Sequence, residues 1–195
     1  MATEPTRAAD EVVDLCRELI RIDSTNYGDG SGPGEREAAG YAADRLREVG
    51  LDPLVLESGP RRTNVVVRLP GADEARTDAL LLHGHLDVVP ADPKQWRYDP
   101  LAGELADGCV WGRGAVDMKN MAAMAAAILV GFRKANLRPA RDIIFAAVSD
   151  EEEGCEQGSA FLVEHHPDLV RAEYALGEGG GFNVDFAGRR FYPIM

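Results

Sequence analysis

The sequence has few cysteines, little positive charge and no long apolar run. Its three cysteines, Cys16, Cys109 and Cys155, are widely spaced and include no Cys-x-x-Cys pair. This pattern excludes a disulfide framework and a zinc ribbon, and it is typical of a reducing compartment. The formal net charge of −12 argues against nucleic acid and membrane surfaces as partners, because both are negatively charged and would repel the chain. No apolar stretch approaches the ~20 residues of a membrane-spanning helix.

The sequence does contain enough apolar material for a globular core. Of its 195 residues, 45% are hydrophobic, and this length suits one substantial domain with the beginning of another. The segment Met1 to Pro5 lacks the basic and apolar regions of a signal peptide. We therefore expect a cytoplasmic protein without a membrane anchor.

Apolar periodicity predicts helices that alternate with strands. Helical spacing predicts helices over residues 9–22, 33–49, 121–135 and 157–166. The helix over residues 121–135 is apolar nearly all round, so we expect it to be buried against the sheet. Pro167 is expected to end the last helix. Short apolar runs predict strands over residues 54–56, 64–69, 80–85, 142–149, 174–177 and 189–195. This alternation predicts an α/β fold with a largely parallel or mixed sheet.

Two irregular segments are expected beside these elements. Residues 23–34 are rich in glycine but lack the Gly-Lys-Ser/Thr ending of a phosphate-binding loop, so we interpret them as a mobile surface loop at the rim of a site. Glu35 and Glu37 suit the first turn of the helix that follows. In the second segment, residues 91–108, Trp96 and Tyr98 either line a pocket or anchor a packed loop.

The strand over residues 80–85 ends in a candidate metal ligand. Side chains alternate along a strand, so His85 and Asp87 are expected to point the same way. Because a carboxylate commonly orients a metal-bound histidine, the pair offers a ligand and its partner. The alternative is a histidine that only caps the strand through satisfied hydrogen bonds. His83 fits a ligand role and a strand-lining role equally well.

Further acidic residues follow the predicted strands or a glycine-flanked turn. They are Asp117, the run Asp150-Glu151-Glu152-Glu153, and Glu178. Ligands of open α/β sheets bind beyond the carboxyl ends of the strands, and carboxylates gathered there repel one another unless a cation offsets their charge. Each acid taken alone is explained by a solvated turn or loop. Together with His85 they predict a zinc site, with cobalt or manganese as substitutes, in which one acid binds metal and its neighbour is the general base.

Four motifs, in this order, resemble those of the dinuclear zinc peptidases and deacylases. They are His85-Leu86-Asp87-Val88-Val89-Pro90, Gly112-Arg113-Gly114-Ala115-Val116-Asp117-Met118-Lys119, Ser149-Asp150-Glu151-Glu152 and Glu178-Gly179-Gly180. That family includes aminoacylase, acetylornithine deacetylase, succinyl-diaminopimelate desuccinylase, glutamate carboxypeptidase and carnosinase-like dipeptidases. The resemblance implies a three-layer α/β catalytic domain with a mixed, mostly parallel sheet. It also implies hydrolysis of amide bonds in small peptides or N-acyl amino acids, with two Zn²⁺ ions per complete site.

The resemblance also implies roles for individual residues. Its metal ligands correspond to His85 and Glu178 for one zinc, Glu152 for the other, and Asp117 as the bridge between them. Asp87 corresponds to the residue that orients the histidine, and Glu151 to the general base. A cis peptide is implied after the bridging aspartate, and a homodimer is implied for the full-length protein.

Two departures from the family pattern shape our expectations. Family members are generally much longer, with a lid or dimerisation domain inserted after the fourth ligand and a final histidine ligand beyond it. We therefore interpret residues 1–186 as the N-terminal part of the catalytic domain, and residues 187–195 as the start of the inserted domain or a linking strand. The fold is then incomplete at its C-terminus.

Neither His165 nor His166 stands in the motif of the final histidine. We therefore expect little activity from this chain alone. One alternative is a truncated, non-catalytic domain that binds metal or a partner. The other is an α/β domain without metal.

Overall fold

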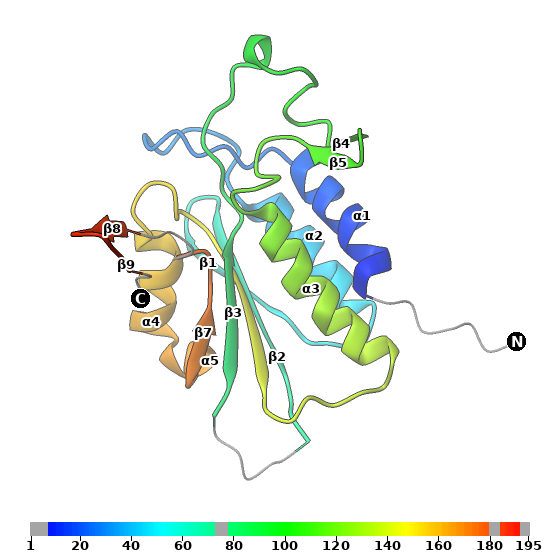
Figure 1. Cartoon of the computed structure of the whole chain (residues 1–195). Helices are drawn as coiled ribbons and strands as arrows, with labels where there is room; N and C mark the ends of the chain where they lie inside the picture. Colours follow the sequence, from blue (N-terminus) through cyan, green and yellow to red (C-terminus); the bar gives the residue numbers. More distant parts are fainter. Residues whose placement is uncertain (1–7, 73–77, 180–183, 192–195) are drawn as a thin grey trace, which may run out of the picture.

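The computed structural model describes residues 8–72, 78–179 and 184–191, and it shows a sheet covered by helices on both faces (Figure 1). The sheet has the strand order β1-β2-β6-β3-β7. Its strands are β1 (Leu54–Gly59), β2 (Arg62–Leu69), β3 (Leu80–His85), β6 (Ile143–Val148) and β7 (Tyr174–Leu176). This arrangement confirms the predicted three-layer α/β fold.

The sheet is mixed, as predicted. Strand β3 pairs in parallel with β6 and β7, whereas β2 pairs antiparallel with both β1 and β6. Strand β2 therefore runs in the opposite direction to the other four strands. A tight hairpin joins it to β1. The carboxyl ends of β3, β6 and β7 consequently lie at the same edge of the sheet, and the loops that follow them begin there (Figure 1).

Three long helices cover one face of the sheet. They are α1 (Ala8–Arg21), α2 (Arg36–Arg47) and α3 (Lys119–Lys134). The main core lies between them and the sheet, and α3 contributes a run of buried alanines that lets α1 approach it closely. Helix α3 is nevertheless buried on one side only, since Met124 is 44% exposed and Ile128 is 39% exposed. The prediction that this helix is buried against the sheet is confirmed, and its other side is exposed.

The opposite face carries a π-helical segment, Glu156–Ala160, continued by α4 (Phe161–His165) and α5 (Pro167–Val170) (Figure 1). Leu162 packs there against Val66, Ile144 and Val148 of the sheet. Pro167 ends the predicted helix and also begins α5, because the first turn of a helix needs no backbone N–H from proline. Both faces of β6 are thus covered, and all six of its residues are buried.

Two hairpins were not predicted. Strands β4 (Glu104–Ala106) and β5 (Cys109–Trp111), with the 3₁₀ turn Pro93–Gln95, lie in or beside the segment expected to be irregular. Strands β8 (Val184–Phe186) and β9 (Arg189–Phe191) pair at the end of the described chain. The rest of the predicted final strand, residues 192–195, lies outside the described residues.

The aromatic residues of the irregular segment make ring contacts within it, and Trp96 also lines an open cavity of about 310 Å³ that reaches Asp117. Tyr98 packs edge-on against Trp111 with ring centroids 5.4 Å apart, and the Arg113 guanidinium lies 5.3 Å from the Trp96 ring centre. These contacts hold the connection between β3 and α3 together. No helix in the described part of the chain is long and apolar enough to cross a membrane.

Candidate metal centre

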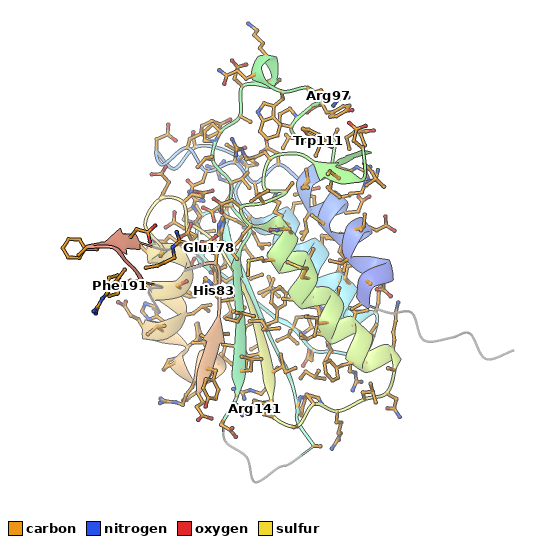
Figure 2. All side chains as sticks on the ribbon, viewed as in Figure 1. His83, Arg97, Trp111, Arg141, Glu178 and Phe191 are labelled. Atoms are coloured by element: carbon orange, nitrogen blue, oxygen red, sulfur yellow. The ribbon has the colours of Figure 1, made fainter. Side chains whose placement is uncertain are left out.

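The candidate centre is built around the buried imidazole of His85 at the carboxyl end of β3. Its Nδ1 lies 2.9 Å from the backbone oxygen of Asp87, an acceptor, so Nδ1 carries a proton and Nε2 faces the acidic residues. Nε2 lies 3.0 Å from Asp117 Oδ1 and 3.6 Å from both Glu151 Oε2 and Glu178 Oε2. Figure 2 shows Glu178 near this edge of the sheet, with His83 deeper along β3.

Ligand atoms from separate loops come together around this nitrogen. One group consists of His85, Asp117 and Glu152, and a second of His85, Glu151 and Glu178; within each, the ligand atoms lie within 4.8 Å of one another. The structure therefore brings together all four predicted ligands and the predicted general base. They come from β3, the turn before α3, the loop after β6 and the loop after β7.

The charges of this cluster favour a bound cation. Burial lowers the pKa of His85, but the hydrogen bond and charge of Asp87, with the charge of Glu178, outweigh it and raise the pKa to about 10. Burial raises the pKa of Glu152 and of Glu178, and neighbouring carboxylates raise both further. The surrounding negative charge thus favours positive charge at His85 Nε2, which a proton supplies in the metal-free chain and a bound cation would supply in its place. One imidazole and several carboxylates form a donor set that fits zinc, so the residues fit the metal that the resemblance implies.

Asp87 joins the histidine to the acidic loop. Its Oδ1 accepts a hydrogen bond from the backbone N–H of Glu151 (3.0 Å), and its Oδ2 accepts one from that of Glu152 (3.2 Å). Burial raises the pKa of Asp87, but hydrogen bonds from His85, Asn26 and Glu151 outweigh this and lower it. The side chain therefore remains ionised in a fully buried position. Asp87 thus holds the imidazole, through its backbone oxygen at 2.9 Å and its Oδ1 at 3.4 Å from Nδ1, and its carboxylate holds the backbone of the loop that carries two acids of the centre.

The four acidic residues Asp150 to Glu153 lie in the turn that follows β6, and they make different contacts. Asp150 has a positive φ of 62°, and its Oδ2 accepts a hydrogen bond from the Gln157 N–H (3.2 Å), so this side chain closes the turn. Glu151 and Glu152 face His85. Glu153 lies against Gly28, where an added β-carbon would come 2.5 Å from Glu153 Oε2. Glycine at position 28 therefore lets the glycine-rich loop approach the acidic turn.

The other histidines lie outside the two ligand groups. His83 Nε2 lies 2.8 Å from Ser159 Oγ, and burial lowers the pKa of this imidazole. His165 and His166 both pack against the Phe161 ring, at 5.1 Å and 5.3 Å between ring centres. The peptide bond between Asp117 and Met118 is cis, as the resemblance implied.

Several polar residues beside the centre were missed or misinterpreted from the sequence. Ser24 to Asn26, predicted to begin a surface loop, are buried and run beside Leu86 to Val88, where the Asn26 N–H donates to the Val88 oxygen (2.9 Å). Glu35, predicted to stabilise a first helical turn, makes no capping hydrogen bond and instead pairs with Arg62 while fully buried. Burial raises its pKa to about 7, although the Arg62 charge opposes this. No spacing in the sequence signals these contacts, because they join distant segments.

Comparison with known proteins identifies the family. The model of "Peptidase family M20/M25/M40" matches residues 81–187. The chain is 35% identical over 162 residues to succinyl-diaminopimelate desuccinylase from Methylobacterium radiotolerans, covering 80% of this chain and 39% of that protein. It is 31% identical over 182 residues to aminoacylase-1 from Sus scrofa, covering 92% and 43% of the two chains.

Solved structures show the same fold. Human carnosine dipeptidase 1 superposes with a TM-score of 0.66 at 28% identity, over 86% of this chain and 38% of that one. The M20 metallo-carboxypeptidase Sso-CP2 from Sulfolobus solfataricus gives 0.67 at 23% identity, over 88% and 38%. The chain thus spans about two fifths of the length of the relatives it matches. Because the family model matches more than half of the 195 residues, the chain belongs to peptidase family M20/M25/M40.

Proposed function

We propose that this chain is the N-terminal, metal-binding part of a zinc-dependent hydrolase of amide bonds in small peptides or N-acyl amino acids. The observation that carries the proposal is the convergence of His85 Nε2 with carboxylates from three separate loops at one edge of the sheet. Family membership supports the reaction class, since the similar proteins are named as a desuccinylase, an aminoacylase and a dipeptidase.

The ligand assignment follows the predicted roles. His85 and Glu178 would hold one zinc, Glu152 the other, and Asp117 would lie between them. The proximity of Asp117 Oδ1 to His85 Nε2, at 3.0 Å, supports a bridging position beside the histidine. Zinc, with cobalt or manganese as substitutes, is favoured by the mixed nitrogen and oxygen donors. Bound zinc would polarise the scissile carbonyl and lower the pKa of the attacking water.

Glu151 is the group proposed to move the proton. Its Oε2 lies 3.6 Å from His85 Nε2, its side chain is 30% exposed, and its backbone is fixed by Asp87. A carboxylate placed in this way can accept a proton from water at one oxygen and deliver it to the departing amine nitrogen. Asp87, fully buried and ionised, would keep the His85 ring in the orientation that leaves Nε2 free for the metal.

The chain alone is proposed to hydrolyse substrate poorly. Among the histidines that the structure describes, His83, His165 and His166 all lie outside the ligand groups, so the second zinc lacks the family's final imidazole. Residues 1–186 remain our proposal for the catalytic part, and residues 187–195 for the start of an inserted domain or linking strand. For the full-length protein we propose a cytoplasmic homodimer.

A second candidate function is a non-catalytic domain that binds metal or a partner. The apolar edge at β7 favours it, because Tyr174 is 54% exposed and Leu176 is 57% exposed. Leu176 also borders an open cavity of about 160 Å³ against α3, lined by Leu82, Met121 and Met124. Exposed apolar surface of this kind marks a contact with further protein.

Substitutions separate the two functions. We expect the wild-type chain to bind zinc in isothermal titration, and Asp117→Ala to abolish binding by removing the proposed bridge. Glu151→Gln keeps the shape of the side chain, so it is expected to bind zinc like the wild type but to lose any hydrolysis of N-acyl amino acids and dipeptides. Unchanged zinc binding by Asp117→Ala would contradict the site assignment. Hydrolysis retained by Glu151→Gln would contradict the general-base role.

A further inference from the structure

A series of hydrogen-bonded polar side chains leads from the start of helix α2 to the candidate metal centre. It runs from Glu35 through Arg62 and Asn26 to Asp87. Glu35, Asn26 and Asp87 are fully buried. Neither the proposed metal ligands nor the proposed catalytic residues include Glu35, Arg62 or Asn26.

The Asn26 side chain has a single orientation defined by its neighbours. Its Oδ1 accepts hydrogen bonds from Arg62 Nη2 (2.7 Å) and the Gly28 N–H (3.1 Å). Its Nδ2 donates to Asp87 Oδ2 (3.0 Å) and to Asp150 Oδ1 (3.3 Å). A rotated amide would set its NH₂ against two donors and its oxygen against two carboxylates, so the observed orientation is strongly favoured.

Arg62 holds the oxygen of this amide in place. One nitrogen of its guanidinium contacts Asn26, while the other donates to Glu35 Oε1 at 2.5 Å. The second carboxylate oxygen of Glu35 has no hydrogen-bond partner within the described part of the chain. A buried ion pair contributes little to stability, because removing two charges from water offsets most of their attraction. Because Arg62 also donates to the Asn26 oxygen, we infer that this ion pair serves to orient the Asn26 side chain.

We propose that Asn26 is a positioning residue for the metal centre, and that the pair of Arg62 and Glu35 fixes the Asn26 amide. The inference rests on the proposed function. Asp87 Oδ2 serves two donors, Asn26 Nδ2 and the Glu152 N–H. Removal of the Asn26 donor frees the Asp87 carboxylate to rotate. Rotation would move Asp87 Oδ1 away from His85 Nδ1, which lies 3.4 Å from it, and would disturb the hydrogen bonds that hold the backbone of Glu151 and Glu152.

A matched control residue separates this role from ordinary fold stabilisation. Asn64 is also fully buried and, like Asn26, hydrogen-bonds near the acidic turn. Its oxygen accepts from the Ser149 N–H (3.0 Å), and its Nδ2 donates to the Gln157 oxygen (3.0 Å). It makes no hydrogen bond with Asp87 among those the structure describes. Loss of either amide should lower stability, but loss of Asn26 should also disturb the metal ligands.

The experiment measures zinc affinity by competition with a chromophoric chelator, the visible absorption of the Co²⁺-substituted chain, and the melting temperature of the metal-free chain. Asn26→Ala is expected to bind zinc about tenfold more weakly and to show an altered Co²⁺ spectrum. Tenfold is the lower end of the loss in metal affinity seen when a residue that holds a metal ligand in place is removed. Asn64→Ala is expected to melt earlier while it keeps the wild-type zinc affinity and spectrum. Zinc affinity of Asn26→Ala within twofold of wild type, or an equal loss in Asn64→Ala, would overturn the proposal.

Arg62→Lys provides a second variant in case Asn26→Ala does not fold. Lysine keeps the charge but lacks the planar fork that contacts Glu35 and Asn26 together. We expect weaker zinc binding with the same spectral change, and unchanged binding would overturn the role of Arg62. Failure of the wild-type chain to bind zinc would overturn the proposed function and this inference together. Zinc binding that is intact in the wild type and unaltered in Asn26→Ala would overturn this inference alone.

Discussion

Replacing Asp87 by asparagine removes one charge from the centre of the site while keeping the shape of the side chain. Asp87 accepts hydrogen bonds from Asn26 Nδ2 and from the backbone N–H groups of Glu151 and Glu152. An asparagine has one acceptor oxygen. If that oxygen serves Asn26 and Glu152, the new NH₂ group faces His85 Nδ1, which lies 3.4 Å from Asp87 Oδ1, and the Glu151 N–H, which loses its acceptor. The opposite orientation takes the acceptor away from the Asn26 amide and the Glu152 N–H, so either orientation leaves at least one buried donor unpaired.

The size of the effect follows from this arrangement. Loss of one buried hydrogen bond to a charged acceptor costs roughly 1.5–3 kcal/mol of unfolding free energy. Zinc affinity is expected to fall about 10- to 100-fold, because the variant loses the negative charge beside His85 Nδ1 and one of the hydrogen bonds that position the loop of Glu151 and Glu152. Chemical denaturation of the metal-free chain measures the first quantity, and chelator competition measures the second.

Asp142→Asn is the control for Asp87→Asn. Asp142 also accepts a backbone hydrogen bond, from the Gly71 N–H at 2.8 Å, but it lies at the opposite end of β6. We expect this variant to bind zinc like the wild type. Wild-type zinc affinity in Asp87→Asn, or an equal loss in Asp142→Asn, would refute the reasoning that Asp87 organises the centre.

Two further predictions concern the pH dependence of stability and the close packing of Gly158. The pKa of His85 is raised from 6.5 to about 10, so its contribution to the stability of the metal-free chain is complete below pH 6.5 and is lost as pH rises toward 10. Melting temperatures that stay flat over this interval would contradict it. Gly158→Ala should unfold at lower denaturant concentration, because the added β-carbon would lie 2.0 Å from the Ser149 backbone oxygen. Gly40→Ala, in an uncrowded part of α2, should instead stabilise the chain by up to about 1 kcal/mol, and the reverse ranking would exclude this steric explanation.

The sequence was most informative where one short segment carries both an element and its chemistry. The run from Leu80 to Asp87 predicts a buried strand and places His85 at its end; the structure has the strand and a buried His85 at its end, while Leu80, Leu81 and His83 are half-buried. The fold class followed from the alternation of strands and helices. The family resemblance followed from four motifs in a fixed order, and the family match confirmed it.

Contacts between distant segments could not be predicted in this way. Asn26 contacts Arg62, Asp87 and Asp150, and nothing in the spacing of these residues indicates that they meet. The composition of residues 23–34 indicated a surface loop because glycine and polar residues dominate it. Its first residues are nevertheless buried, since their backbone pairs with the segment after β3. The side chain of Glu35 was misinterpreted for the same reason.

The exposed side of α3 shows a different limit of sequence reasoning. The sequence predicts that this helix is buried against the sheet, and it is, but the described structure places little against Met124 and Ile128 on its other side. Periodicity reports that a residue is apolar, and it does not report which segment would cover it.

The central claim is that one imidazole, from His85, and carboxylates from separate loops bind zinc. Zinc K-edge X-ray absorption of the purified, zinc-loaded chain tests it most directly, with His85→Ala measured alongside. The account predicts one imidazole nitrogen per chain and otherwise oxygen ligands at about 2.0–2.2 Å, with loss of the imidazole signal in the variant. Sulfur ligation, an imidazole signal that survives His85→Ala, or failure of the chain to retain zinc would contradict it.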